Sequence, residues 1–214
     1  MQNLECQVDN HFYNKNYDSL PRFVSYYHQI NTILKLETNN ILEIGVGNKM
    51  VSNYLKEMGL NLTTCDFDTN LKPDIVADIR KIPLPDNSFE TVMACEVLEH
   101  LPWKQLDSAL AELFRITNKY VVVSIPYASL CFEFAFKFPN ADKIFKNYFA
   151  NLLIRIPLKV KNKFNGEHYW EMGKIGFPKS KIRKLLSKYF NILEESSPAL
   201  SSYHYFFVLK KKKP

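Results

Sequence analysis

One glutamate and two glycines stand together at the end of a short apolar segment, and this combination could bind a ligand. Ile41–Ile44 is predicted to be a buried strand, and Glu43 lies just before Gly45 and Gly47, after which a helix begins. Glycine lets the backbone approach a ligand closely, and the first turn of a helix offers unpaired N–H groups. The residues around this turn decide which ligand it accepts.

Three kinds of nucleotide-binding turn can be compared with this one. A phosphate-binding loop needs G-x-x-x-x-G-K-[ST], and the sequence contains none. A dinucleotide-binding turn needs a third glycine where Met50 stands, and the charge of Glu43 is unfavourable beside a pyrophosphate. A ligand that carries a cationic ammonium or sulfonium group suits Glu43 better.

Two further acidic residues indicate what other groups the ligand carries. Asp66, at the end of the next apolar segment, can accept hydrogen bonds from both hydroxyls of a ribose. Asp78 can accept from an adenine amino group while the N–H of Ile79 donates to a ring nitrogen. Together with the glycine turn, this set predicts a methionyl-adenosine. The alternatives are a capping or ion-pair role for Glu43 and a local turn at Asp78.

Four segments over residues 40–126 resemble class I S-adenosylmethionine-dependent methyltransferases, most of all the small-molecule branch that includes ubiquinone-biosynthesis enzymes. In chain order they are Leu42–Gly47, Asp66, Ala77–Val92 and Glu96–Leu101. The resemblance implies S-adenosylmethionine as cofactor, and it implies a role for nine residues. Glu43, Gly45 and Gly47 are expected to hold the methionine portion, and Asp66, with Phe67 beside it, the ribose. Asp78 and Ile79 are expected to hold the adenine. Glu96 and Val97 are expected to line the methyl-donor pocket.

Strands and helices are predicted to alternate along the chain. The expected strands are Ile41–Ile44, Asn61–Cys65, Ile75–Ala77, Phe89–Cys95, Tyr120–Ile125, Phe190–Leu193 and Tyr203–Leu209. The expected helices are Pro21–Glu37, Met50–Met58, Trp103–Ile116 and Lys179–Lys188. The alternation predicts an α/β, Rossmann-like three-layer αβα fold with a mostly parallel sheet. The resemblance implies seven strands, the last of them antiparallel.

We expect one methyltransferase domain over residues 1–214. An N-terminal arm and helix form residues 1–38, and residues 128–170 form an inserted lid or acceptor region. The helix within 1–38 is expected to bury an apolar face that consists of Phe23, Tyr26, Tyr27, Ile30, Ile33, Leu34 and Leu36.

Methyl transfer to an oxygen also requires a base that removes a proton. His100, His168 and Tyr127 are the candidates, because they follow strands or lie in an aromatic turn after the insertion. A structural role for His100 and plain packing for the other two remain open. The remaining histidines, His11, His28 and His204, are interpreted as surface or core residues. The sequence shows no metal-type spacing of histidine and carboxylate, and its four cysteines are scattered, so no metal is predicted.

The acceptor must be inferred from charge and from the insertion. Residues 1–127 hold 11 Lys/Arg and 16 Asp/Glu, whereas residues 128–214 hold 17 and 6. The first hypothesis is a small-molecule, glycan or lipid-linked acceptor, with peripheral membrane contact through the aromatic and basic insertion. A helix pair packed on the core explains the insertion equally well. The alternatives are an RNA or protein methyltransferase that uses the basic half, and a non-catalytic adenosyl-binding scaffold.

The start of the sequence lacks a basic region followed by an apolar run, and no apolar run reaches the roughly 20 residues that span a bilayer. With the scattered cysteines, this predicts a cytoplasmic location.

Overall fold

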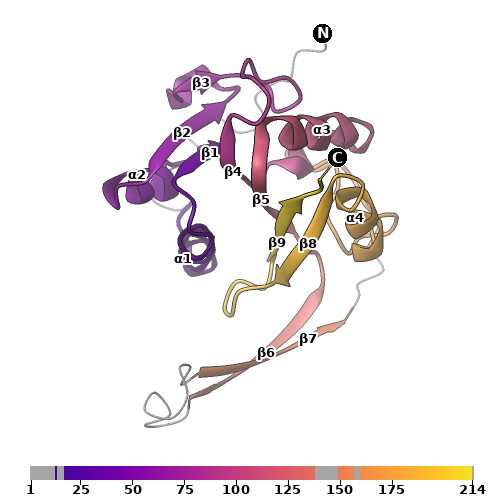
Figure 1. Ribbon diagram of the computed structural model, residues 1–214. Helices are drawn as coiled ribbons and strands as arrows, with labels where there is room; N and C mark the ends of the chain where they lie inside the picture. Colours follow the sequence, from indigo (N-terminus) through magenta and orange to yellow (C-terminus); the bar gives the residue numbers. More distant parts are fainter. Residues whose placement is uncertain (1–12, 14–16, 138–148, 157–159, 214) are drawn as a thin grey trace.

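Seven strands form the central sheet of the computed structural model, which describes residues 13, 17–137, 149–156 and 160–213 (Figure 1). They are β1 (Asn40–Ile44), β2 (Asn61–Asp66), β3 (Ile75–Val76), β4 (Phe89–Cys95), β5 (Thr117–Pro126), β8 (Phe190–Ser196) and β9 (His204–Lys211). The order across the sheet is β3-β2-β1-β4-β5-β9-β8. The last strand, β9, runs antiparallel to both β5 and β8. The predicted fold class is therefore confirmed.

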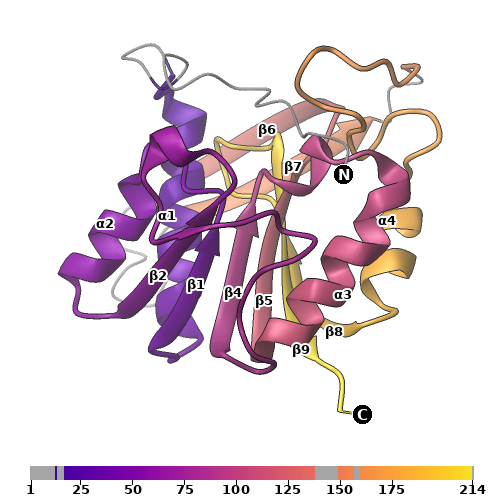
Figure 2. The same cartoon turned by 90° about the horizontal axis from the view of Figure 1, so that it is seen from above.

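Helices cover both faces of this sheet (Figure 2). On one face lie α1 (Leu20–Lys35) and α2 (Met50–Glu57), and on the other lie α3 (Leu106–Ile116) and α4 (Lys179–Leu186). Adjacent strand residues serve opposite faces, since Val122 packs with α1 and α2 while Val121 packs with the α3 and α4 cluster. Within the described ranges, the connections contain the short 3-10 helices η2 (Thr69–Leu71), η3 (Leu98–His100) and η4 (Trp103–Gln105). In the described part of the chain, we find no helix with the length and apolar character that a bilayer crossing requires.

The prediction for the buried face of α1 was partly wrong. Tyr26 and Ile33 are buried, but Phe23 and Tyr27 are 47% and 67% exposed. Leu34 is exposed as well. The other buried positions are polar, namely Ser25, Gln29 and Thr32. The reason is that one side of α1 borders a pocket as well as the core, so polar side chains occupy part of its inner face.

The carboxyl ends of the parallel strands meet at one edge of the sheet. Ile44 at the end of β1 pairs with Cys65 of β2 and with Ala94 of β4. The loops that follow these three strands therefore start side by side. In open α/β sheets this edge is where ligands bind.

The insertion after β5 forms a β-ribbon, so the alternative of a core-packing helix pair was wrong. β6 (Leu130–Lys137) pairs antiparallel with β7 (Phe149–Ile156), and the ribbon extends away from the main sheet (Figure 1). Its residues alternate, which is the strand period. One face carries apolar side chains that are each about half exposed, namely Leu130, Phe132, Phe134, Phe136, Leu152, Ile154 and Ile156. The central part of the expected insertion, residues 138–148, lies outside the described residues, as do residues 157–159.

Candidate active site

The glycine turn after β1 comes so close to the loop after β4 that a side chain would not fit. Gly45 has a φ of +80°, and a Cβ built on it would lie 2.4 Å from Cγ2 of Val97. Gly47 has a φ of +48°, with the ring of Tyr13 nearby. Both glycines are therefore required by conformation, and Gly45 by space as well.

Asp66 connects the end of β2 to this turn. Its Oδ2 accepts a hydrogen bond of 2.9 Å from the N–H of Val46, and its Oδ1 accepts one of 3.0 Å from the N–H of Asp68. Burial raises the pKa of the Asp66 carboxyl, while these bonds oppose the shift. Each carboxylate oxygen keeps a second lone pair for a ligand hydroxyl. Asp68 itself caps η2, because its Oδ1 accepts a hydrogen bond of 2.9 Å from the N–H of Asn70.

Glu43 lies beneath the glycine turn and is only 5% exposed. Its Oε2 has no hydrogen-bond partner among the described residues. Burial raises the pKa of the Glu43 carboxyl to about 8. A cationic group in the neighbouring pocket would compensate for this buried charge.

Asp78 is held by its neighbour Arg80. The Nε of Arg80 donates to both carboxylate oxygens, at 2.9 and 3.0 Å, and the N–H of Arg80 donates to Oδ1 at 2.8 Å. These bonds and the guanidinium charge lower the pKa of the Asp78 carboxyl, although burial opposes the shift. The carboxylate therefore stays ionised and fixed at the pocket wall.

Glu96 occupies an unusual backbone position directly after β4. Its φ is +54°, a region that few residues other than glycine adopt, and such strain is common at functional sites. Ser124 donates to its Oε1 at 2.8 Å, and Nε2 of His204 lies 4.0 Å from its Oε2. Burial raises the pKa of the Glu96 carboxyl.

All the residues predicted to contact the cofactor line one pocket at the carboxyl edge of the sheet. They are Glu43, Gly45, Gly47, Asp66, Phe67, Asp78, Ile79, Glu96 and Val97. Their contact with a bound cofactor remains a prediction, but the sequence segments that contain them meet in space. His100 lines the same pocket.

Several pocket residues were missed from the sequence. Tyr13 and Tyr17 come from the segment interpreted as a loose arm, Arg22 and Gln29 come from α1, and His204 begins β9. His204 is 5% exposed and was expected to be unrelated to the site. Neither end of the chain has a local motif that would indicate its place at the pocket. The one available signal was the set of polar residues on the inner face of α1.

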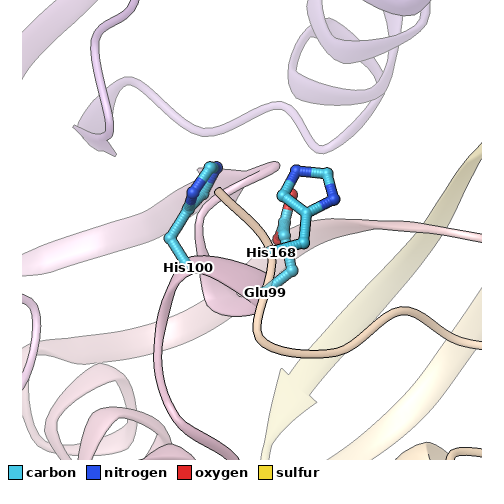
Figure 3. A group of neighbouring side chains, drawn as sticks. All are labelled: Glu99, His100 and His168. Carbon is cyan, nitrogen blue, oxygen red and sulfur yellow. The ribbon is translucent and has the colours of Figure 1, made fainter. Parts of the chain in front are cut away.

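The three candidate bases differ in position. His100 and His168 form an edge-to-face pair with ring centroids 5.0 Å apart, and Glu99 lies next to them (Figure 3). Burial lowers the pKa of His100 to about 4. Tyr127 is not among the residues that line the pocket, and its ring instead lies against the guanidinium of Arg155 at 4.4 Å. The structure therefore brings the two histidines together and separates Tyr127 from them.

Comparison with known proteins supports the same class. The family model described as a methyltransferase domain matches residues 42–123, which run from β1 into β5. No curated protein matches the sequence significantly. The matched methyltransferase domain and the fold confirm the predicted resemblance to class I S-adenosylmethionine-dependent methyltransferases. The ubiquinone-biosynthesis branch remains a prediction.

Three solved structures illustrate the similarity of fold. The CcbJ methyltransferase from Streptomyces caelestis has a TM-score of 0.62 at 11% identity, covering 98% of this chain and 100% of its own. Magnesium protoporphyrin IX methyltransferase from Synechocystis PCC 6803, with bound S-adenosylhomocysteine, has a TM-score of 0.57 at 14% identity, covering 90% and 83%. The 1,6-didemethyltoxoflavin-N1-methyltransferase from Burkholderia thailandensis has a TM-score of 0.56 at 13% identity, covering 90% and 86%. At these identities the similarity concerns the fold alone.

Proposed function

We propose that this chain transfers a methyl group from S-adenosylmethionine to a small-molecule, glycan or lipid-linked acceptor. One observation carries the proposal: residues predicted from four separate segments line a single pocket at the carboxyl edge of the sheet. The matched methyltransferase domain supplies most of that pocket. The similar enzymes that act on a magnesium porphyrin and on a toxoflavin precursor support an acceptor of small-molecule type.

The pocket residues fit the cofactor. Bound S-adenosylmethionine supplies a methyl group on a positively charged sulfur. The unpartnered Oε2 of Glu43 is suited to the ammonium of its amino-acid end, beside the bare backbone of Gly45. Asp66 would accept from the ribose through its second lone pairs, and Asp78 with Ile79 would hold the adenine.

Catalysis by this chain would consist mainly of positioning. Glu96 and Val97 line the pocket and are expected beside the methyl group of the cofactor. Holding donor and acceptor in line accounts for much of the rate enhancement in such reactions. His100 is neutral at pH 7 because burial lowers its pKa to about 4. Since its Nδ1 lies 3.0 Å from the carbonyl oxygen of Glu167, the ring proton lies on Nδ1 and the lone pair lies on Nε2.

The apolar face of the β6–β7 ribbon favours a lipid-linked acceptor among the three kinds. Phe132 and Ile154 are directly paired on that face and are 47% and 45% exposed. A continuous row of exposed apolar side chains with a polar surround often marks an interaction site. Lys161 and Lys163 are exposed just after the ribbon, in the basic half of the chain, which suits anionic headgroups.

A labelled methyl donor tests the proposal. The purified chain is incubated with methyl-labelled S-adenosylmethionine and fractionated extracts, and we expect label in an acceptor that partitions into organic solvent. Label that appears only in RNA or protein would overturn the proposed acceptor class. Binding of S-adenosylhomocysteine without transfer to any fraction would identify a scaffold instead of an enzyme.

A further inference from the structure

Three side chains with metal-ligating atoms meet beside the pocket. Glu99 and His100 belong to η3, and His168 comes from the segment after the ribbon (Figure 3). One ligand atom from each lies within 4.8 Å of the other two. Ligands at 2.0–2.2 Å from one ion lie up to roughly 4 Å apart. Side-chain rotations that move these atoms by less than about 1 Å would therefore bring them onto a single ion.

Glu99 is the least expected member of this group. Its side chain is 0% exposed, and neither carboxylate oxygen has a hydrogen-bond partner among the described residues. Burying an ionised carboxylate without a partner costs several kcal/mol. The nearby carboxyl groups of Glu96 and Glu171 add to this cost instead of reducing it. A cation bound between Glu99 and the histidines removes it.

Both histidines are already oriented through Nδ1. Nδ1 of His100 lies 3.0 Å from the carbonyl oxygen of Glu167, and Nδ1 of His168 lies 3.1 Å from Oε1 of Glu171. Because these oxygens accept, the ring proton lies on Nδ1 and the lone pair lies on Nε2. Histidines that bind metal ions show the same arrangement, in which a carbonyl or carboxylate holds the other ring N–H.

The backbone around the cluster is fixed from both sides. The N–H of Tyr169 donates to the carbonyl of Glu99 at 2.9 Å, and Nε1 of Trp170 donates to the carbonyl of Leu101 at 3.1 Å. Lys174 pairs with Glu171 at 3.0 Å, which fixes the carboxylate that orients His168. Aromatic packing alone would account for the contact between the histidine rings, but it leaves the buried carboxylate unexplained.

We propose that Glu99, His100 and His168 bind one divalent transition-metal ion, of the kind that zinc exemplifies. Two imidazole nitrogens and one carboxylate are a donor set found in catalytic zinc sites, which keep a further position open. His100 also lines the pocket, so a metal ion held by these residues would lie beside the proposed cofactor site. A metal ion there would acidify a hydroxyl bound to it, and this inference, which rests on the proposed function, deepens it by favouring an oxygen acceptor. The prediction of no metal rested on spacing along the sequence, and this cluster forms only in the fold.

Metal binding is tested with the tag-free chain after chelator treatment. Co²⁺ is titrated while its visible absorption is recorded, and Zn²⁺ is then added as a competitor. We expect one Co²⁺ per chain, displaced by Zn²⁺, and binding at least about tenfold weaker in His168→Asn. His28→Asn is the matched control, because Nε2 of His28 contacts Ser196 away from the cluster.

Binding of S-adenosylhomocysteine, measured by calorimetry on the same variants, separates the two proposals. His168→Asn should retain it, since His168 does not line the pocket. If His168→Asn fails to fold, Glu99→Gln provides the same comparison. A wild-type chain without stoichiometric Co²⁺ binding, or variants that bind Co²⁺ as tightly as the wild type, would overturn the metal site and leave the methyltransferase proposal standing.

Discussion

Oδ2 of Asp66 accepts a hydrogen bond of 2.9 Å from the backbone N–H of Val46. This bond joins the end of β2 to the glycine turn after β1, so one carboxylate both shapes the turn and borders the pocket. The two segments are neighbours because β1 and β2 pair in parallel and end at the same edge. The remaining lone pairs of Asp66 are the basis of the proposed ribose contact.

Replacing Asp66 should therefore weaken cofactor binding. We expect Asp66→Ala to raise the dissociation constant of S-adenosylhomocysteine by at least about tenfold, because charge-assisted hydrogen bonds of about 1.5–3 kcal/mol are lost. Calorimetry measures this, with Asp86→Ala as the control, since Asp86 is an exposed partner of Arg115. Unchanged affinity in Asp66→Ala would remove the ribose assignment.

A side chain at Gly45 should be more harmful than one at Gly59. Both glycines have positive φ angles, +80° and +87°, but a Cβ at Gly59 meets nothing within 4 Å. Gly59→Ala measures the cost of the backbone conformation, about 1–2 kcal/mol. We expect Gly45→Ala to lose about 1–3 kcal/mol more in the free energy of unfolding, because its methyl group overlaps Val97. Urea denaturation of both variants compares them, and equal losses would contradict the close approach.

Glu43 should make the ligand-free chain less stable as the pH rises. Its pKa is raised from 4.5 to about 8, so between these values the folded state holds a proton that the unfolded state releases. Stability therefore falls with increasing pH across this window. We expect Glu43→Gln to match the wild type near pH 4.5 and to be more stable than it by on the order of 4 kcal/mol near pH 8.

The same variant should bind the cofactor less well. Gln cannot supply the negative charge for the ligand ammonium, so the affinity for S-adenosylhomocysteine should fall while stability improves. Unfolding curves at several pH values and calorimetry test the two halves. A stability difference that does not change with pH would show that Glu43 does not titrate in this window.

The acidic residues that line the pocket could be predicted from the sequence because each lies in a short local motif. Glu43, Asp66 and Glu96 each lie at the end of an apolar strand, and parallel strands place such ends at one edge. The alternation of strands and helices likewise determined the sheet. Neither inference required knowledge of long-range packing.

Residues distant in sequence were not predictable in this way. Tyr13 and His204 reach the pocket only through tertiary packing of the two ends of the chain. His168 lies beside Glu99 in the fold, where the N–H of the next residue, Tyr169, donates to the carbonyl oxygen of Glu99. The ribbon was missed for another reason. Its aromatic and basic composition indicated an insertion, whereas the alternation of Phe132 and Phe134 with Glu133, which indicates a strand, was not used.

The apolar face of the ribbon should govern contact with a lipid-linked acceptor. We expect the double variant Phe132→Ser, Ile154→Ser to lose co-sedimentation with anionic phospholipid vesicles and to keep its affinity for S-adenosylhomocysteine. Asn151→Ser, a polar change at an exposed position of the same ribbon, is the control. Vesicle binding by the double variant equal to that of the control would exclude this face as the lipid contact.

The central claim is tested most directly by a crystal structure of the chain with S-adenosylhomocysteine. The account predicts the amino-acid end at Glu43 and Gly45, the ribose hydroxyls within hydrogen-bond distance of Asp66, and the adenine beside Ile79. A nucleoside bound elsewhere, or a pocket that excludes the compound at saturating concentration, would contradict it.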